Sequence, residues 1–223
     1  MQNTRKYLLA LSTYAGTIIG VGLFGLPFVA MQIGFIPIVI YFIILGWVIF
    51  QVAMMYAEVV SRTPESHRLP GYAELYLGRK YRNASLVSHF VGLNGTQLAY
   101  ILVGGGFLSS YFQPLFGGPA LLYHLVFFTI GAAIVYIGTK SLGQVEFLSL
   151  GLFFAVMITM FVMGWSSVDI NNLLTFNPKQ LILPYGVILF SLGGFSVIPE
   201  IKDILKDKGE TLMSKVILGG TIL

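Results

Sequence analysis

The sequence contains no cysteine, so disulfide bonds and thiolate metal ligands are excluded and the redox compartment cannot be inferred. Charge is also scarce, because only 10% of the 223 residues are charged, against roughly 25% in a typical soluble domain. Three histidines are present, and none has a second histidine or a carboxylate at metal-ligand spacing. We therefore expect no metal site and no cofactor.

The apolar residues make up 56% of the sequence and are gathered into long runs without charge. A helix needs about 20 such residues to cross the hydrocarbon core of a bilayer. The runs predict an all-α integral membrane protein with a single transmembrane domain at 1–223. The expected spans lie at about 7–31, 35–60, 85–112, 119–139, 145–165 and 181–201, with a partial span at 212–223.

The basic residues are distributed unevenly between the two sides of these spans. If the amino terminus lies inside, twelve of the 13 Lys and Arg residues fall in inner segments, and only Lys179 falls outside. Because inner segments of membrane proteins carry this excess, we expect a multi-pass protein of the cell membrane with a cytoplasmic amino terminus. The net charge of +4 then reflects orientation in the lipid bilayer, and no nucleic-acid partner is expected.

A glycine-dense stretch, Gly-Thr-Ile-Ile-Gly-Val-Gly-Leu-Phe-Gly-Leu-Pro at 16–27, lies in the middle of the first span. Glycine and proline weaken a helix, so four glycines before Pro27 predict an interruption there. Within a bilayer, backbone freed from helical hydrogen bonds is tolerated only where it is buried in protein or lines a polar cavity. The stretch therefore predicts a binding site near the membrane midplane.

The sixth span contains a second interruption, Phe-Ser-Leu-Gly-Gly-Phe-Ser-Val-Ile-Pro-Glu at 190–200. Gly194 precedes Pro199 by the same spacing as Gly22 precedes Pro27. The two spans run in opposite directions across the membrane, so the pair predicts an inverted repeat with a site between its halves. The alternative is that the glycines only allow close helix packing, which we favour for Gly104, Gly105 and Gly106 in the third span.

A broken helix presents free N–H groups at the start of one half and free C=O groups at the end of the other. A zwitterionic α-amino acid suits two such breaks, its carboxylate taking N–H donors and its ammonium taking carbonyls. In the third span, Gln97 and Tyr100 share a helix face, which makes Tyr100 a further candidate. The predicted substrate-binding residues are Gly20, Val21, Gly22, Leu23, Phe190, Ser191, Gly193, Gly194, Phe195 and Tyr100.

Two inner features have plainer interpretations. The loop at 61–83 is expected to be a solvated connector, since turn chemistry such as Pro70-Gly71 is routine in loops, and the alternative is a short helix at 72–77 that lies at the membrane interface. Glu58 and Glu200 lie toward inner span ends, where solvated carboxylates are the usual case. The alternative is that either carboxylate forms a cytoplasmic gate with Arg5 or Lys6.

Three stretches together resemble amino acid permeases of the amino acid/polyamine/organocation superfamily, most closely the aromatic amino acid and amino acid/auxin permease branches. They are the glycine-dense stretch, Leu-Pro-Gly-Tyr-Ala-Glu-Leu-Tyr-Leu-Gly at 69–78, and Gly-Val-Ile-Leu-Phe-Ser-Leu-Gly-Gly-Phe-Ser-Val-Ile-Pro-Glu-Ile at 186–201. The resemblance implies a LeuT-type inverted-repeat fold, alternating access, and symport with a proton or sodium ion. It also implies that carbonyls near Gly16 and Ile19 form half of an ion site.

Permeases of this kind usually have about 11 spans, whereas this chain is expected to stop within its seventh. The expected unit is the first five-helix repeat, the sixth helix and the start of the seventh, with a second chain as one possible source of the missing repeat. The leading hypothesis is a secondary active transporter of a neutral amino acid, aromatic ones included, and not an enzyme. The alternatives are a non-transporting membrane interaction subunit and, more remotely, an intramembrane serine protease at Ser196, which lacks a following glycine and a midplane histidine.

Overall fold

The computed structural model describes residues 2–137, 142–169, 173–205 and 209–222, in which all regular structure is helical. The predicted all-helical membrane architecture is confirmed at this level. Of the basic residues assigned to inner segments, Lys140, Lys206 and Lys208 lie outside the described residues. The chain forms two compact units, unit 1 from Met1–Arg68 and Gly143–Leu223, and unit 2 from Leu69–Leu142.

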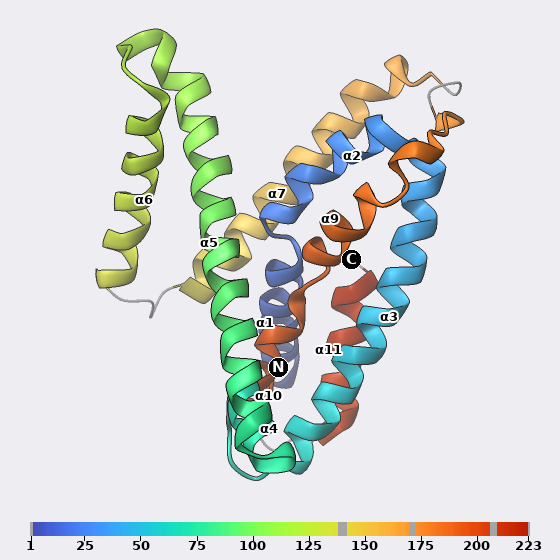
Figure 1. The fold of residues 1–223 in the computed structure, drawn as a ribbon, viewed down its shortest axis with the longest axis vertical. Coiled ribbons are helices and arrows are strands. Elements are labelled where there is room, and N and C mark those ends of the chain that lie inside the picture. Colours follow the sequence, from blue (N-terminus) through green and yellow to red (C-terminus); the bar gives the residue numbers. More distant parts are fainter. Residues whose placement is uncertain (1, 138–141, 170–172, 206–208, 223) are drawn as a thin grey trace. The chain divides into compact units, whose positions relative to one another are not determined.

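Unit 1 begins with a broken helix (Figure 1). Its elements are α1 (Gln2–Ile18), the short 3-10 helix η1 (Val21–Gly25) and α2 (Leu26–Ile33). Gly20 interrupts the helix with extended backbone, and Pro27 occupies the first turn of α2, where its missing N–H costs nothing. The first broken helix ends at Gly34, whose φ of 103° is a conformation that glycine adopts readily.

The long helix α3 (Phe35–Arg62) follows directly and packs against α2. The turn between them is tightly covered, because a Cβ at Gly34 would lie 1.8 Å from the carbonyl oxygen of Thr175. The N–H of Asn177 also donates to the carbonyl of Ile33 over 3.1 Å. The segment that precedes the second broken helix is therefore anchored on this turn.

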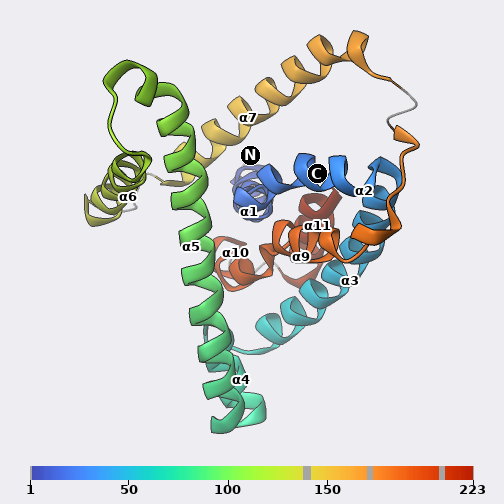
Figure 2. The same cartoon turned by 45° about the horizontal axis from the view of Figure 1, so that its top comes forward.

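The second broken helix occupies the predicted sixth span. Its elements are α9 (Leu183–Ser191), the 3-10 helix η4 (Gly194–Val197) and α10 (Ile198–Leu205). It runs antiparallel to the first, since α9 contacts α2 whereas α10 contacts α1 (Figures 1 and 2). Figure 2 shows α9 close to α3 as well, and α11 (Gly209–Ile222) between α1 and α3.

The remaining elements of unit 1 are α7 (Leu142–Gly164) and two short 3-10 helices, η2 (Trp165–Ser167) and η3 (Pro178–Gln180). The apolar core of unit 1 includes a cluster contributed by α2, α3 and α9. Its buried members are Val29, Ile33, Ile38, Leu45, Ile49, Ile188 and Leu192.

Unit 2 consists of α4 (Leu69–Leu77), α5 (Arg79–Phe116) and α6 (Ala120–Ile137). Two of the three consecutive glycines on α5 lie directly against α6. A Cβ at Gly104 would fall 2.3 Å from the ring of Phe127, and one at Gly105 would fall 2.6 Å from the Cα of His124. These two glycines thus serve the predicted helix packing, while Gly106 has no neighbouring atom within 4 Å of such a Cβ.

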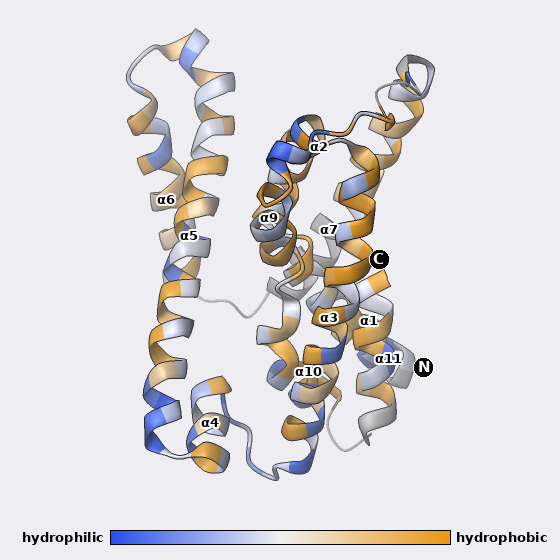
Figure 3. Ribbon diagram, turned by 45° about the vertical axis from the view of Figure 1, so that its right-hand side comes forward, coloured by the Kyte–Doolittle hydropathy of each residue, from blue (hydrophilic) through white to orange (hydrophobic). Residues whose placement is uncertain are grey.

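Apolar residues are frequent along the helices (Figure 3), and many large apolar side chains are exposed. Large side chains such as Met31 and Trp47 are 84% and 65% exposed, as expected for faces that contact lipid. Among the described residues, three helical stretches are long and apolar enough to cross a membrane: Thr4–Ile33, Phe35–Arg62 and Arg79–Phe116. Shorter apolar helices lie at Ala120–Tyr136, Gly151–Gly164 and Leu212–Ile222.

Candidate functional site

The two helix interruptions lie against each other in unit 1. A Cβ at Gly22 would stand 2.7 Å from the Cα of Ser191 and 3.0 Å from its backbone nitrogen. A Cβ at Gly194 would stand 2.5 Å from Cγ1 of Ile18. Side-chain carbons are essentially never this close to other atoms, so only glycine allows the two backbones to approach to this distance.

These contacts are reciprocal. Ser191 is the last residue of α9 and Ile18 is the last residue of α1. Each glycine therefore rests on the end of the helix that precedes the other interruption, which is the pattern expected around a local two-fold axis. The continuing helices match as well, because α2 and α10 are each eight residues long and carry proline at their second position.

The first interruption exposes backbone donors. The N–H of Gly20 turns back to the carbonyl of Ile18 over 2.8 Å, and η1 starts at the next residue. Because the first N–H groups of a helix have no partner within it, those of Val21 and Gly22 are directed away from η1. Both residues are buried, so these donors lie inside the protein.

The second interruption exposes the carboxyl end of α9. Its carbonyls are partly engaged, since that of Phe190 accepts from the N–H of Gly193 at 3.3 Å and also from the N–H of Leu192, while that of Leu192 accepts from the N–H of Gly194 at 2.8 Å. A carbonyl has two lone pairs, so one acceptor position remains on Leu192. The hydroxyl of Ser191 is buried and donates to the carbonyl of Ile188 over 2.9 Å.

The side chains around the two interruptions are mainly apolar. Phe190 is 44% exposed, and Phe195 is half-buried. Leu23 and Ile19 are also half-buried. The arrangement thus offers polar backbone groups from two helix ends together with aromatic side chains, and the residues between the helical halves, 19–25 and 192–197, carry no formal charge.

Tyr14 is a residue that the sequence reasoning missed. Its side chain is fully buried, and its ring lies between η4 and α11. A Cβ at Gly194 would be 3.4 Å from Cε2 of this ring, and a Cβ at Gly220 would be 2.4 Å from its Cδ1. The sequence did contain a signal for Tyr14. It lies four residues before Ile18, about one helical turn, so the two side chains share a face of α1.

The contacts between the two interruptions leave three predicted residues untested. Tyr100 lies on α5 in unit 2, where it is 44% exposed. Gly16 lies on α1 with no neighbour within 4 Å of a Cβ, and Ile19 follows the end of α1. The ion half-site at Gly16 and Ile19 and the role of Tyr100 stay predictions. Within the described ranges no group of His, Asp or Glu is arranged to hold a metal ion.

Comparison with known proteins gives two matches. A model of the tryptophan/tyrosine permease family matches residues 3–223. A curated relative, the tyrosine-specific transport system 1 of Haemophilus influenzae, is 25% identical over 214 residues, which cover 93% of this chain and 52% of the relative. The chain thus spans about half the length of that relative, and no solved structure matches it. Since the family match extends over nearly the whole chain, the chain belongs to the tryptophan/tyrosine permease family.

Proposed function

We propose that the chain is part of a secondary active transporter of aromatic amino acids, which binds its substrate at the paired interruptions and works by alternating access. The observation that carries the proposal is the reciprocal contact of Gly22 with Ser191 and of Gly194 with Ile18. It brings a helix amino end and a helix carboxyl end together inside one unit. The family match and the printed specificity of the Haemophilus influenzae relative support the aromatic substrate class.

Recognition of the amino acid group follows from the two helix ends. The N–H groups of Val21 and Gly22 lie at the positive end of the helix that continues as α2, where they suit a carboxylate. The carbonyl of Leu192 lies at the negative end of α9, where its remaining acceptor position suits an ammonium group. Both charges of a zwitterion are then balanced without placing a charged side chain in the membrane, which is costly.

The antiparallel course of the two broken helices supports an inverted repeat of the LeuT type and membership of the wider amino acid/polyamine/organocation superfamily. In that arrangement the amino terminus is cytoplasmic, and a second repeat completes the fold. We propose that this repeat is supplied by a further polypeptide segment, in the same chain or a second one. Carbonyls near Gly16 and Ile19 would then contribute to a site for the coupling ion, a proton or sodium.

Competition by substrate analogues tests the proposal. Radiolabelled tyrosine is bound to the complete transporter in proteoliposomes. The concentration of tryptophan, tyramine or 3-(4-hydroxyphenyl)propionate that displaces half of the bound tyrosine is then measured. Tyramine lacks the carboxylate and the propionate lacks the ammonium. Each loss removes charge-assisted hydrogen bonds worth about 1.5–3 kcal/mol, so each analogue should bind roughly tenfold to hundredfold more weakly than tyrosine.

Equal competition by tyramine and tyrosine would contradict recognition of the carboxylate by the first interruption. A protein that inserts normally and binds none of these compounds would instead support the interaction-subunit alternative. The protease hypothesis at Ser196 is excluded, because the chain belongs to a family of permeases and not of enzymes.

A further inference from the structure

The segment Thr63–Arg68, which we call the strap, joins α3 to α4 and lies along α10. The guanidinium of Arg68 donates to the carboxylate of Glu200 over 2.5 Å. The hydroxyl of Ser66 donates to the carboxylate of Asp203 over 3.4 Å. The strap is therefore not only the solvated connector predicted from sequence, and Glu200 pairs with the strap instead of Arg5 or Lys6.

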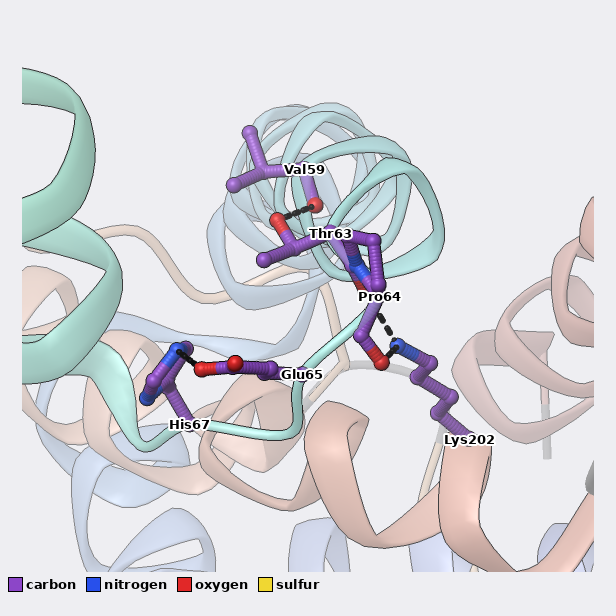
Figure 4. Close-up of polar contacts among 6 residues, drawn as sticks. All are labelled: Val59, Thr63, Pro64, Glu65, His67 and Lys202. Carbon is purple, nitrogen blue, oxygen red and sulfur yellow. Dashed lines mark hydrogen bonds and ion pairs between the residues drawn. The ribbon is translucent and has the colours of Figure 1, made fainter.

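Lys202 makes the third contact between α10 and the strap (Figure 4). Its ammonium donates to the carbonyl of Thr63 at 2.5 Å and reaches the carbonyl of Pro64 at 3.5 Å. Thr63 directly follows the last residue of α3, where backbone carbonyls lack partners within the helix and the helix dipole favours a positive charge. Lys202, although it belongs to α10, thus caps the carboxyl end of α3.

All three charged residues of α10 are used in this way, since its other residues are apolar. The opposite face of α10 carries Ile198, Ile201 and Leu205, which are at most 2% exposed. On the other side of the interruption, α9 carries no charge and packs through apolar contacts with α2 and α3. The two halves of the second broken helix are therefore held by different means.

We infer that the strap holds α10 in the observed position, that Lys202 is its main positioning residue, and that release of the strap opens the second interruption toward the side of the membrane where α3 ends. This inference rests on the proposed function, because it assigns the strap to one step of alternating access. The chain leaves unit 1 at Arg68 and enters unit 2 at Leu69.

The absence of cysteine allows a direct test by thiol labelling. Ser196 on the half-buried part of η4 is replaced by cysteine in the complete membrane-inserted protein. Membrane vesicles that expose the strap side are treated with a membrane-impermeant maleimide, and the labelling rate is measured without substrate. Lys202→Met should raise the rate about tenfold or more, the effect expected from losing one charge-assisted hydrogen bond, whereas Lys202→Arg should stay within about twofold of the parent.

Glu74→Gln is the matched control, because it removes a contact with Arg82 of 3.4 Å within unit 2 and leaves the strap intact. Its labelling rate should equal that of the parent. An unchanged rate in Lys202→Met would overturn the inference, and so would an equal increase in Glu74→Gln. Labelling needs no substrate, so the role of the strap and the proposed function are tested separately. A failure to bind tyrosine would contradict the proposed function and not the role of the strap.

If Lys202→Met does not accumulate in the membrane, a charge reversal decides the question. Arg68→Glu and Glu200→Arg should each raise labelling of the cysteine, and the double variant should return it toward the parent rate because the ion pair is re-formed. A double variant that labels as fast as the faster single variant would contradict the role of the strap.

Discussion

Replacement of Gly22 by alanine adds one methyl group at the closest approach of the two interruptions. Its carbon would lie 2.7 Å from the Cα of Ser191, whereas ordinary contacts begin at 3.4 Å, so the two backbones must separate by about 0.7 Å. The obstructing atom belongs to the backbone and cannot be relieved by a rotamer change. Forcing such an extra methyl group into a packed interior costs about 1–3 kcal/mol.

The cost should be measured in substrate affinity, because the separated groups are the donors and acceptors proposed to bind the amino acid. Equilibrium binding of labelled tyrosine to the complete transporter should weaken by roughly fivefold to hundredfold in Gly22→Ala. Thermal unfolding in detergent, followed on the same samples, reports how much of the strain appears as lost stability. Membrane insertion should be unaffected.

Gly186→Ala is the matched control. Gly186 lies on α9, with nothing within 4 Å of a Cβ, so alanine there meets open space and improves helix propensity by about 1 kcal/mol. Tyrosine binding should be unchanged, and stability should be equal or higher. If Gly22→Ala binds tyrosine as well as Gly186→Ala does, the close approach of the interruptions is not needed for binding and the reasoning is refuted.

Three further predictions test the packing. Gly194→Ala should weaken tyrosine binding by a smaller factor than the change at Gly22, because its added methyl group meets a side chain. Adding Ile18→Ala should restore part of the lost binding, with a coupling of about 0.5–3 kcal/mol in a double-mutant cycle, and no recovery would argue against the contact. Gly34 and Gly78 both have positive φ, but only at Gly34 would a Cβ strike a carbonyl. Thermal denaturation should therefore show Gly78→Ala losing about 1–3 kcal/mol of stability and Gly34→Ala clearly more, and equal losses would mean that backbone strain alone matters. Gly220→Ala should place a methyl group against the ring of Tyr14, and such overpacking costs about 1–3 kcal/mol of folding stability. The unfolding temperature should therefore fall, and an unchanged temperature would contradict that contact.

Local features of the fold were accessible from sequence because their causes are local. Extended backbone at Gly20 and proline in the first turn of α2 and α10 follow from what glycine and proline do to a helix. The uncharged runs likewise identified a helical membrane protein. For Gly104 and Gly105, the choice between helix packing and unwinding was also predictable, since the next proline, Pro114, lies nine residues beyond Gly105, whereas proline lies five residues beyond Gly22 and Gly194.

The contacts between distant segments were not accessible in the same way. Nothing local to Gly22 indicates that its neighbour is Ser191, because a glycine that unwinds a helix and one that allows close packing have the same sequence signature. Here Gly22 does both. The strap was interpreted as a solvated connector for a similar reason, since the charges of α10 that bind it lie more than a hundred residues away.

The reciprocal glycine contacts have a consequence for how specificity can change. Since Gly22 rests on the end of α9 and Gly194 on the end of α1, neither half of the proposed amino acid site can widen without moving the other. The part of the proposed site that recognises the substrate's amino and carboxyl groups thus has one shared width, set by the backbone of Ser191 at Gly22 and by the side chain of Ile18 at Gly194. Substitution of side chains such as Phe190 can then favour a different substrate side chain, while recognition of the amino and carboxyl groups is unchanged. Relatives could therefore differ in substrate specificity and keep the same contacts between the two interruptions.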